Sequence, residues 1–174
     1  AAMWGRPYDE VARWDDDLAL TYKWGEAGAL RDYGDFHADN GALEKAIATY
    51  EEAAALAPRD RKPAQWASIQ NDYGWALYTL GERNRDPQRL KRAIDVLTAA
   101  VAATPPWTSP NDAAISKMNL ANAISALGQR ESDSTHLKDA VALYEDALSS
   151  LSRADYGYTW GRLEMNLGTT LAFL

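Results

Sequence analysis

The fold of this chain is decided by residues 74–106, which read GWALYTLGERNRDPQRLKRAIDVLTAAVAATPP. In the second half of this stretch, apolar residues recur every three or four positions, which predicts one amphipathic helix. The residues of this stripe are Leu90, Ala93, Ile94, Leu97, Ala100 and Val101. Asp86 stands where an N-cap belongs, Pro87 suits the first helical position, and Gly81 is predicted to end the preceding helix as a C-cap glycine. The stretch therefore predicts two helices joined by a short polar turn.

The same pattern recurs without a gap every 47 residues. The coinciding positions include Asp39, Asp86 and Asp133; Leu43, Leu90 and Leu137; Ala46, Ala93 and Ala140; Gly34, Gly81 and Gly128; and Leu30, Leu77, Ile124 and Leu171. Self-similarity at a fixed period is typical of a repeat architecture. We expect one domain over residues 1–174: an N-terminal extension at 1–14, units at about 15–61, 62–108 and 109–155, and a partial unit at 156–174.

The predicted class is all-α, an α-solenoid of antiparallel helix pairs with three and a half units. Seven helices are expected near residues 8–34, 40–56, 63–81, 86–103, 110–128, 134–152 and 156–173. No segment alternates polar and apolar residues over a strand's length, so strands are not expected. Ala93 and its equivalents are predicted where neighbouring helices approach closely.

The spacing of alanine, a large residue, alanine and proline resembles the tetratricopeptide repeat. The spacing is found in Ala46–Tyr50–Ala53–Pro58, in Ala93–Leu97–Ala100–Pro105 and in Ala140–Tyr144–Ala147, where Ser152 replaces the proline. The pair Leu167–Gly168 also resembles the family's Leu-Gly pair. The period of 47 departs from the family's standard of about 34 residues. The family's signature tryptophan is also replaced, by Lys23, Gln70, Lys117 and Glu164. The chain thus resembles a long-form variant of the family.

The resemblance implies that the first helix of each unit lines a concave groove that binds a peptide or helical segment of a partner protein. The family's groove positions fall on Trp24, Arg31, Asn71, Trp75, Tyr78, Met118, Asn122, Ser125 and Met165. In one subset of the family, lysine in this groove clamps a terminal carboxylate. The lysine position is occupied here by Trp24, Asn71, Met118 and Met165. None of these is basic, so an apolar or mixed segment is favoured.

The aromatic residues divide between core and groove. Those on the apolar stripes are predicted to be core: Tyr50, Trp66, Tyr73 and Tyr144. Trp75 and Tyr78 lie off the stripe and three positions apart, so an exposed groove pair and a core pair both remain open. Trp24 is either a groove residue or packed against Tyr8, Val11 and Trp14, and Trp107 is predicted to pack over the corner between units.

The composition argues against catalysis and against metal or cofactor binding. There is no cysteine, and the two histidines, His37 and His136, lie far apart in the sequence and are expected in solvated loops. The run Asp15–Asp17 is interpreted as the first turn of a helix. We therefore expect no enzyme activity, no catalytic residue, no metal and no cofactor.

The charge and the hydropathy bear on partners and compartment. A net charge of −7 disfavours nucleic acid as a partner. No apolar run is long enough for a membrane span or resembles a signal peptide, so a cytoplasmic protein is expected, with the periplasm left open.

The sequence leaves two alternatives to a protein-binding scaffold open. One is a regulatory or sensory arm of a larger multidomain protein, and the other is a self-assembling structural repeat. The apolar residues of the last helix, among them Leu163, Leu167, Leu171 and Phe173, predict that residues 160–174 pack against further repeats or against a second copy in a dimer.

Overall fold

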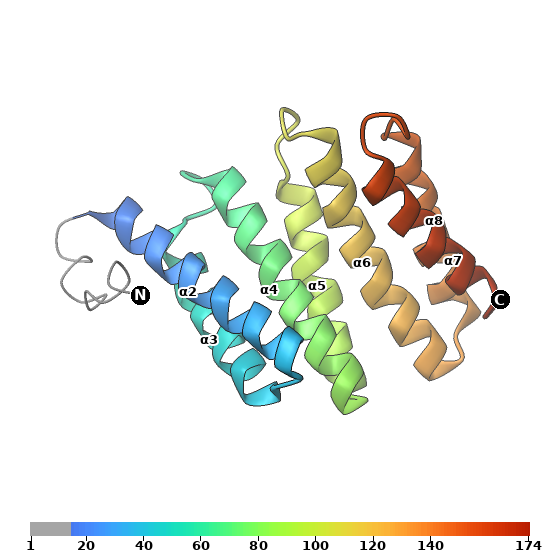
Figure 1. Cartoon of the computed structure of the whole chain (residues 1–174), viewed down its shortest axis with the longest axis horizontal. Coiled ribbons are helices and arrows are strands. Elements are labelled where there is room, and N and C mark those ends of the chain that lie inside the picture. Colours follow the sequence, from blue (N-terminus) through green and yellow to red (C-terminus); the bar gives the residue numbers. More distant parts are fainter. Residues whose placement is uncertain (1–14) are drawn as a thin grey trace.

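The computed structural model describes residues 15–174 and is all-α over that range (Figure 1). Its helices are α2 (Asp16–His37), α3 (Asn40–Leu56), α4 (Pro63–Asn84), α5 (Pro87–Ala103), α6 (Pro110–Glu131), α7 (Ser134–Ser149) and α8 (Gly157–Leu171). The predicted class and all seven helices are confirmed. The predicted start of the first helix, residues 8–14, lies outside the described residues.

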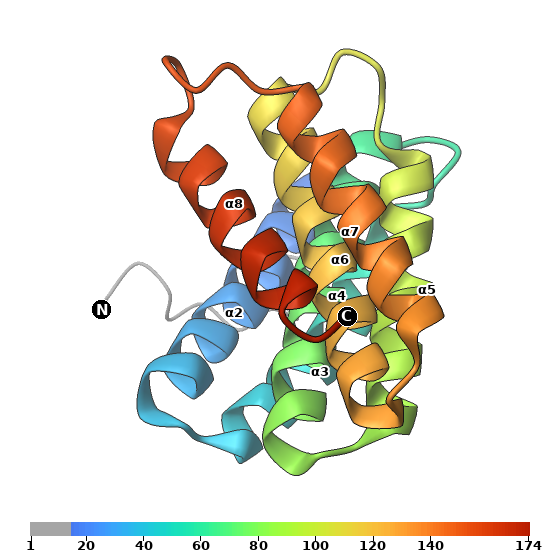
Figure 2. The ribbon, with the colours of Figure 1, turned by 90° about the vertical axis from the view of Figure 1, so that its right-hand side faces the viewer.

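The helices form antiparallel pairs, α2 with α3, α4 with α5 and α6 with α7, and each pair packs on the next. We call α2, α4, α6 and α8 the first helices, and α3, α5 and α7 the second helices. The backbone of each first helix also lies close to that of the next first helix, whereas the second helices α3 and α5 meet through long side chains, in the ion pairs Arg89–Glu44 and Arg92–Glu51. The stack is therefore tighter along the first helices, and Figure 2 shows α2 and α8 on the side away from α5 and α7.

The second helices begin where the sequence predicts. The carboxylate of Asp39 accepts a hydrogen bond from the backbone N–H of Ala42, and Asp86 and Asp133 cap α5 and α7 in the same way. A side-chain oxygen at this position satisfies backbone donors that have no partner inside the helix. The periodic aspartate is thus a start signal for every second helix.

The predicted ends of the first helices are wrong. The helices continue past Gly34, Gly81 and Gly128, and the caps in left-handed conformation are Ala38, Arg85 and Ser132, with φ of 53°, 53° and 55°. The glycines serve packing instead. A Cβ added at Gly81 would lie 3.1 Å from Leu90, and one at Gly128 would lie 3.1 Å from Leu137. Each glycine therefore lets the leucine of the paired second helix approach the first helix.

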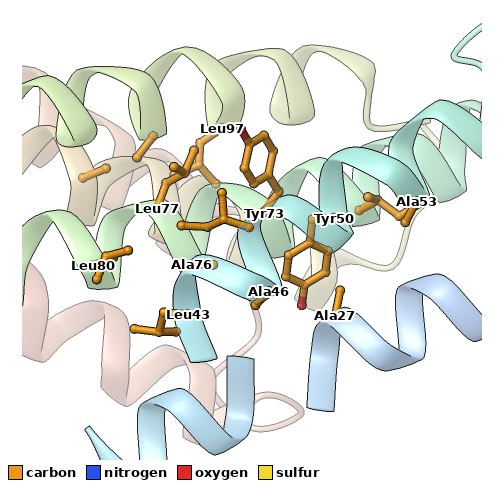
Figure 3. Packing of buried hydrophobic residues seen from close by; sticks show 14 of the residues in the cluster. Ala27, Leu43, Ala46, Tyr50, Ala53, Tyr73, Ala76, Leu77, Leu80 and Leu97 are labelled. Carbon is orange, nitrogen blue, oxygen red and sulfur yellow. The ribbon is translucent and has the colours of Figure 1, made fainter. Parts of the chain in front are cut away.

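The core follows the predicted stripes. Leu43, Tyr50, Leu90, Leu97 and Tyr144 are fully buried or nearly so. Figure 3 shows Tyr50 beside Ala27 and Leu97 beside Leu77. Tyr73 is also buried, while Trp66 is partly buried beneath the guanidinium of Arg59. The prediction that these tyrosines are core is confirmed.

An arginine near the end of α4 and another near the end of α6 link the second and third units to the units before them. Arg83 donates to the carbonyl of Gly34 at 2.9 Å and to the carboxylate of Asp35 at 3.3 Å. One period later, Arg130 donates to Glu82 at 2.9 Å. Partly exposed ion pairs of this kind contribute little to stability. Their recurrence shows instead that successive units stack in the same register.

Candidate partner-binding cleft on the first-helix face

A cleft of about 410 Å³ opens along the N-terminal halves of α4 and α6. Trp24 of α2 lines it, and the loop between α5 and α6 contributes Thr104, Pro105, Trp107, Thr108 and Ser109. The remaining lining residues are small, polar or aliphatic: Ala64, Ala67, Ser68, Asn71, Asp72, Asp112, Ile115 and Ser116. Of the predicted groove residues, the cleft brings together two, Trp24 and Asn71.

Trp24 is held by a carboxylate of the next first helix. Its indole Nε1 donates to Asp72 Oδ2 at 2.9 Å, and Arg31 Nη1 lies 3.1 Å from Asp72 Oδ1. Burial raises the pKa of the Asp72 carboxyl above its ordinary value, and the bonds from Trp24 and Arg31 oppose that rise. This arrangement fixes the Trp24 ring at the cleft. The alternative packing of Trp24 against Tyr8, Val11 and Trp14 concerns residues outside the described range.

Arg31 and Asn71 contact protein groups. The guanidinium of Arg31 contacts Asp32 as well as Asp72. Asn71 accepts a hydrogen bond from Asn119 Nδ2 at 3.1 Å, which joins α4 to α6 beside the cleft. The bond to Asn119 uses only the amide oxygen of Asn71. Asn71 therefore supports the cleft and also lines it.

Trp75 and Tyr78 form an aromatic pair whose ring centroids are 5.0 Å apart. Both are partly buried, and Tyr78 packs against the core around Leu80 and Leu90. Burial, with a smaller effect of Glu82, raises the pKa of Tyr78 to about 12. The pair lies outside the cleft lining. Tyr78 is thus partly a core residue, and Trp75 is partly buried beside it.

The expectation that Met118, Asn122 and Ser125 belong to an exposed groove is wrong. Met118 is fully buried, and Asn122 and Ser125 are buried with it. Asn122 Oδ1 accepts hydrogen bonds from the Tyr144 hydroxyl at 2.6 Å and from Asn166 Nδ2 at 2.9 Å, and Ser125 pairs with Thr170. The reason is that on this face of α6 Asn122 and Ser125 are bonded to residues of α7 and α8, which cover them.

Met165 is 64% exposed on α8, apart from the cleft. Trp107 is 76% exposed and lines the cleft, so its predicted packing over the inter-unit corner is also wrong. Sequence reasoning missed Trp107 as a binding residue. Pro105 and Pro106 directly before it are the available signal, because proline disrupts a helix and the next residue is then presented on a loop.

The cleft carries negative charge. Asp72 and Asp112 line it, and none of its lining residues is a lysine or arginine. Its hydroxyl groups come from Ser68, Thr104, Thr108, Ser109 and Ser116. Among residues 15–174, no three His, Asp or Glu side chains come together as a metal site. The arrangement presents two indoles, several hydroxyls and carboxylates, which suits recognition of a mixed apolar and cationic group.

Comparison with known proteins adds no assignment: no family model matches the chain, and no curated protein matches it. The likeness to the tetratricopeptide repeat therefore rests on the residues quoted above. Each helix in the part of the chain described by the structure is too short or too polar to span a lipid bilayer.

Proposed function

We propose that this chain is an interaction scaffold that binds a short segment of a partner protein in the cleft on its first-helix face. The observation that carries the proposal is the ~410 Å³ cleft with Trp107 on its lining, 76% exposed. A tryptophan ring left largely in water costs free energy unless a partner covers it. Tryptophan is also among the residues most often found at the energetic centre of an interface.

The chemistry of the lining selects the segment. Asp112 has no lining cation beside it, whereas Asp72 is already paired with Arg31, which reaches it from outside the cleft. A lysine or arginine of the partner can pair with Asp112 and also stack favourably on an indole face. The Trp107 ring and Ile115 accept an aliphatic or aromatic neighbour of that cation. The bound segment is therefore expected to carry a basic residue next to an apolar one.

A displayed peptide library selected against the wild-type chain tests this proposal. The selected peptides should be enriched in adjacent basic and apolar residues. Trp107→Ala should weaken their binding by about 2 kcal/mol, since truncation of hot-spot aromatics typically has this effect. Ser68→Arg, which places a cation and a bulky side chain in the lining, should weaken it as well.

Phe36→Ala is the matched control, because Phe36 is 86% exposed on α2 and lies outside the cleft lining. It should leave binding unchanged, and none of the three variants should lower the melting temperature appreciably. If the selected peptides bind Trp107→Ala and Ser68→Arg as tightly as the wild type, the cleft is not the binding site.

A further inference from the structure

Two side-chain hydrogen bonds join consecutive first helices at equivalent positions beside the cleft. Trp24 Nε1 donates to Asp72 Oδ2 at 2.9 Å, which joins α2 to α4. Asn119 Nδ2 donates to Asn71 Oδ1 at 3.1 Å, which joins α4 to α6. Asn71 and Asn119 stand one period after Trp24 and Asp72. The chain therefore repeats one contact between first helices, and of these two copies the first has an aromatic donor and a charged acceptor.

Asp72 is anchored to α2 through both of its carboxylate oxygens. Besides the bond from Trp24 to Oδ2, Arg31 Nη1 lies 3.1 Å from Oδ1. Trp24 and Arg31 are about two turns apart on α2. The negative charge of Asp72 is thus compensated within the protein, and its side chain is 28% exposed. A cation of a bound segment gains little from a carboxylate that already has a cationic partner.

Asp112 is the opposite case. It is exposed in the first turn of α6 and lines the cleft. Its backbone N–H donates to the hydroxyl of Ser109, and its carbonyl accepts from the hydroxyl of Ser116. Within residues 15–174 its carboxylate has no hydrogen bond or ion pair. The charge of Asp112 is therefore the one that a cation in the cleft meets without compensation.

We propose that these two carboxylates have separate roles: Asp112 sets the charge preference of the cleft, whereas Asp72 is a positioning residue that acts on the bound segment through Trp24. The inference rests on the proposed function and deepens it, because it assigns recognition of the cation to one residue. Without the bond to Asp72, the Trp24 side chain is free to adopt other rotamers. Binding then costs the entropy of ordering it.

Two blocked tripeptides, acetyl-Leu-Lys-Leu-amide and acetyl-Leu-Glu-Leu-amide, test the role of Asp112. Their binding is followed by the indole NMR signal of Trp107, which lines the cleft. The wild-type chain should bind the lysine tripeptide about 3- to 10-fold more tightly at low salt, because the lysine is attracted by Asp112 and the glutamate is repelled. Asp112→Asn should remove most of this preference, and Asp112→Lys should reverse it.

Asp95→Asn is the matched control for charge. Asp95 is exposed on α5 and lies outside the cleft lining. Its substitution changes the net charge of the chain as much as Asp112→Asn does. The preference for the lysine tripeptide should nevertheless be unchanged, because the charge is removed away from the cleft.

The role of Asp72 is tested in an Arg31→Ala background, so that no cation loses its partner when Asp72 is changed. In this background Asp72→Asn keeps an acceptor oxygen for Trp24 without the charge, and Asp72→Ala removes the acceptor. The asparagine variant should bind both tripeptides as the wild type does. The alanine variant should bind both about 3- to 10-fold more weakly, with the same preference for lysine, because the Trp24 ring must then be ordered on binding.

A measurement without peptide separates positioning of Trp24 from a general loss of structure. In the alanine variant the Nε1–H signal of Trp24 should move and its exchange with water should become faster, whereas in the asparagine variant this proton should stay protected. The signal of Trp107 should be the same in both variants. Thermal melting reports folding separately.

Three results would overturn the inference. They are equal binding, or no binding, of the two tripeptides by the wild-type chain; a lysine preference that survives Asp112→Asn; and identical tripeptide binding and Trp24 exchange in the alanine and asparagine variants at position 72. The proposed function fails on a different result, namely tight binding of the selected peptides by both Trp107→Ala and Ser68→Arg.

Discussion

Asn122 and Tyr144 are joined by a buried hydrogen bond of 2.6 Å from the tyrosine hydroxyl to the amide oxygen. Two periods earlier, the equivalent positions hold Gly28 and Tyr50. The Tyr50 hydroxyl is fully buried and finds no hydrogen-bond partner among residues 15–174. A Cβ added at Gly28 would lie 3.9 Å from that hydroxyl. The hydroxyl of the tyrosine at this position therefore has a hydrogen-bond partner in the third unit and none in the first.

Removal of the hydroxyl should change the free energy of unfolding differently at the two tyrosines. Tyr144→Phe should lower the free energy of unfolding by about 0.5–1.5 kcal/mol, the net value of a typical internal hydrogen bond. Tyr50→Phe should leave it unchanged or raise it, because the removed group has no partner. Chemical denaturation of both variants measures this, and equal losses would show that Tyr50 is bonded after all.

Adding the missing partner should stabilise the first unit. Alanine normally exceeds asparagine in helix propensity by roughly 0.6 kcal/mol. Gly28→Asn should nevertheless be at least as stable as Gly28→Ala, because its amide oxygen is placed to accept from Tyr50. In a Tyr50→Phe background this advantage should disappear. A double-mutant cycle from urea unfolding decides it, and an unchanged difference between the backgrounds would refute the bond.

The close approach of paired helices should be sensitive to added volume at Ala93, which is fully buried. Ala93→Leu should destabilise the fold by roughly 1–3 kcal/mol through overpacking. Ala102→Leu, an exposed alanine of the same helix, is the control and should change stability by less than about 0.5 kcal/mol. Similar effects of the two substitutions on thermal melting would place the core on another face of α5.

Alkaline pH should lower the stability of the fold. Burial, as the largest cause, raises the pKa of Tyr50, Tyr73 and Tyr144 above 10.0, and raises that of Tyr78 to about 12. In the unfolded chain these groups ionise near pH 10, so unfolding releases protons there. Stability is therefore complete below pH 10 and falls as the pH rises from about 10 to 12. Melting temperatures across this window, with tyrosinate absorbance, test it, and Tyr144→Phe should reduce the slope. A flat profile would contradict these shifts.

The sequence was sufficient to predict whatever depends on local signals repeated three times. The aspartate caps, the stripe through Leu90, Ala93 and Leu97, and the small alanines each predict a feature of one helix or one helix pair, and each is found. The helix ends were mispredicted for a physical reason. Gly81 suits a left-handed cap in isolation, but its lack of a side chain is needed for Leu90, and Arg85 adopts the left-handed conformation.

The groove was predicted less well because burial there depends on how the adjacent units pack. Trp24 and Asn71 lie at the cleft, while Met118 and Asn122 are enclosed because α8 packs beside α6. The spacing of a repeat specifies which residues face the inner side, but not how closely adjacent first helices approach. Trp107 was missed because the course of a loop is set by the two units that it joins.

The most direct test of partner binding in the cleft is the change in the tryptophan indole NMR signals when a selected peptide is added. The cleft account predicts that the Nε1–H signals of Trp24 and Trp107 shift, because both line the cleft. The signal of Trp160, which lies on α8 against the core around Tyr144, should stay in place. Shifts confined to Trp160, or a bound peptide that moves neither Trp24 nor Trp107, would contradict the account.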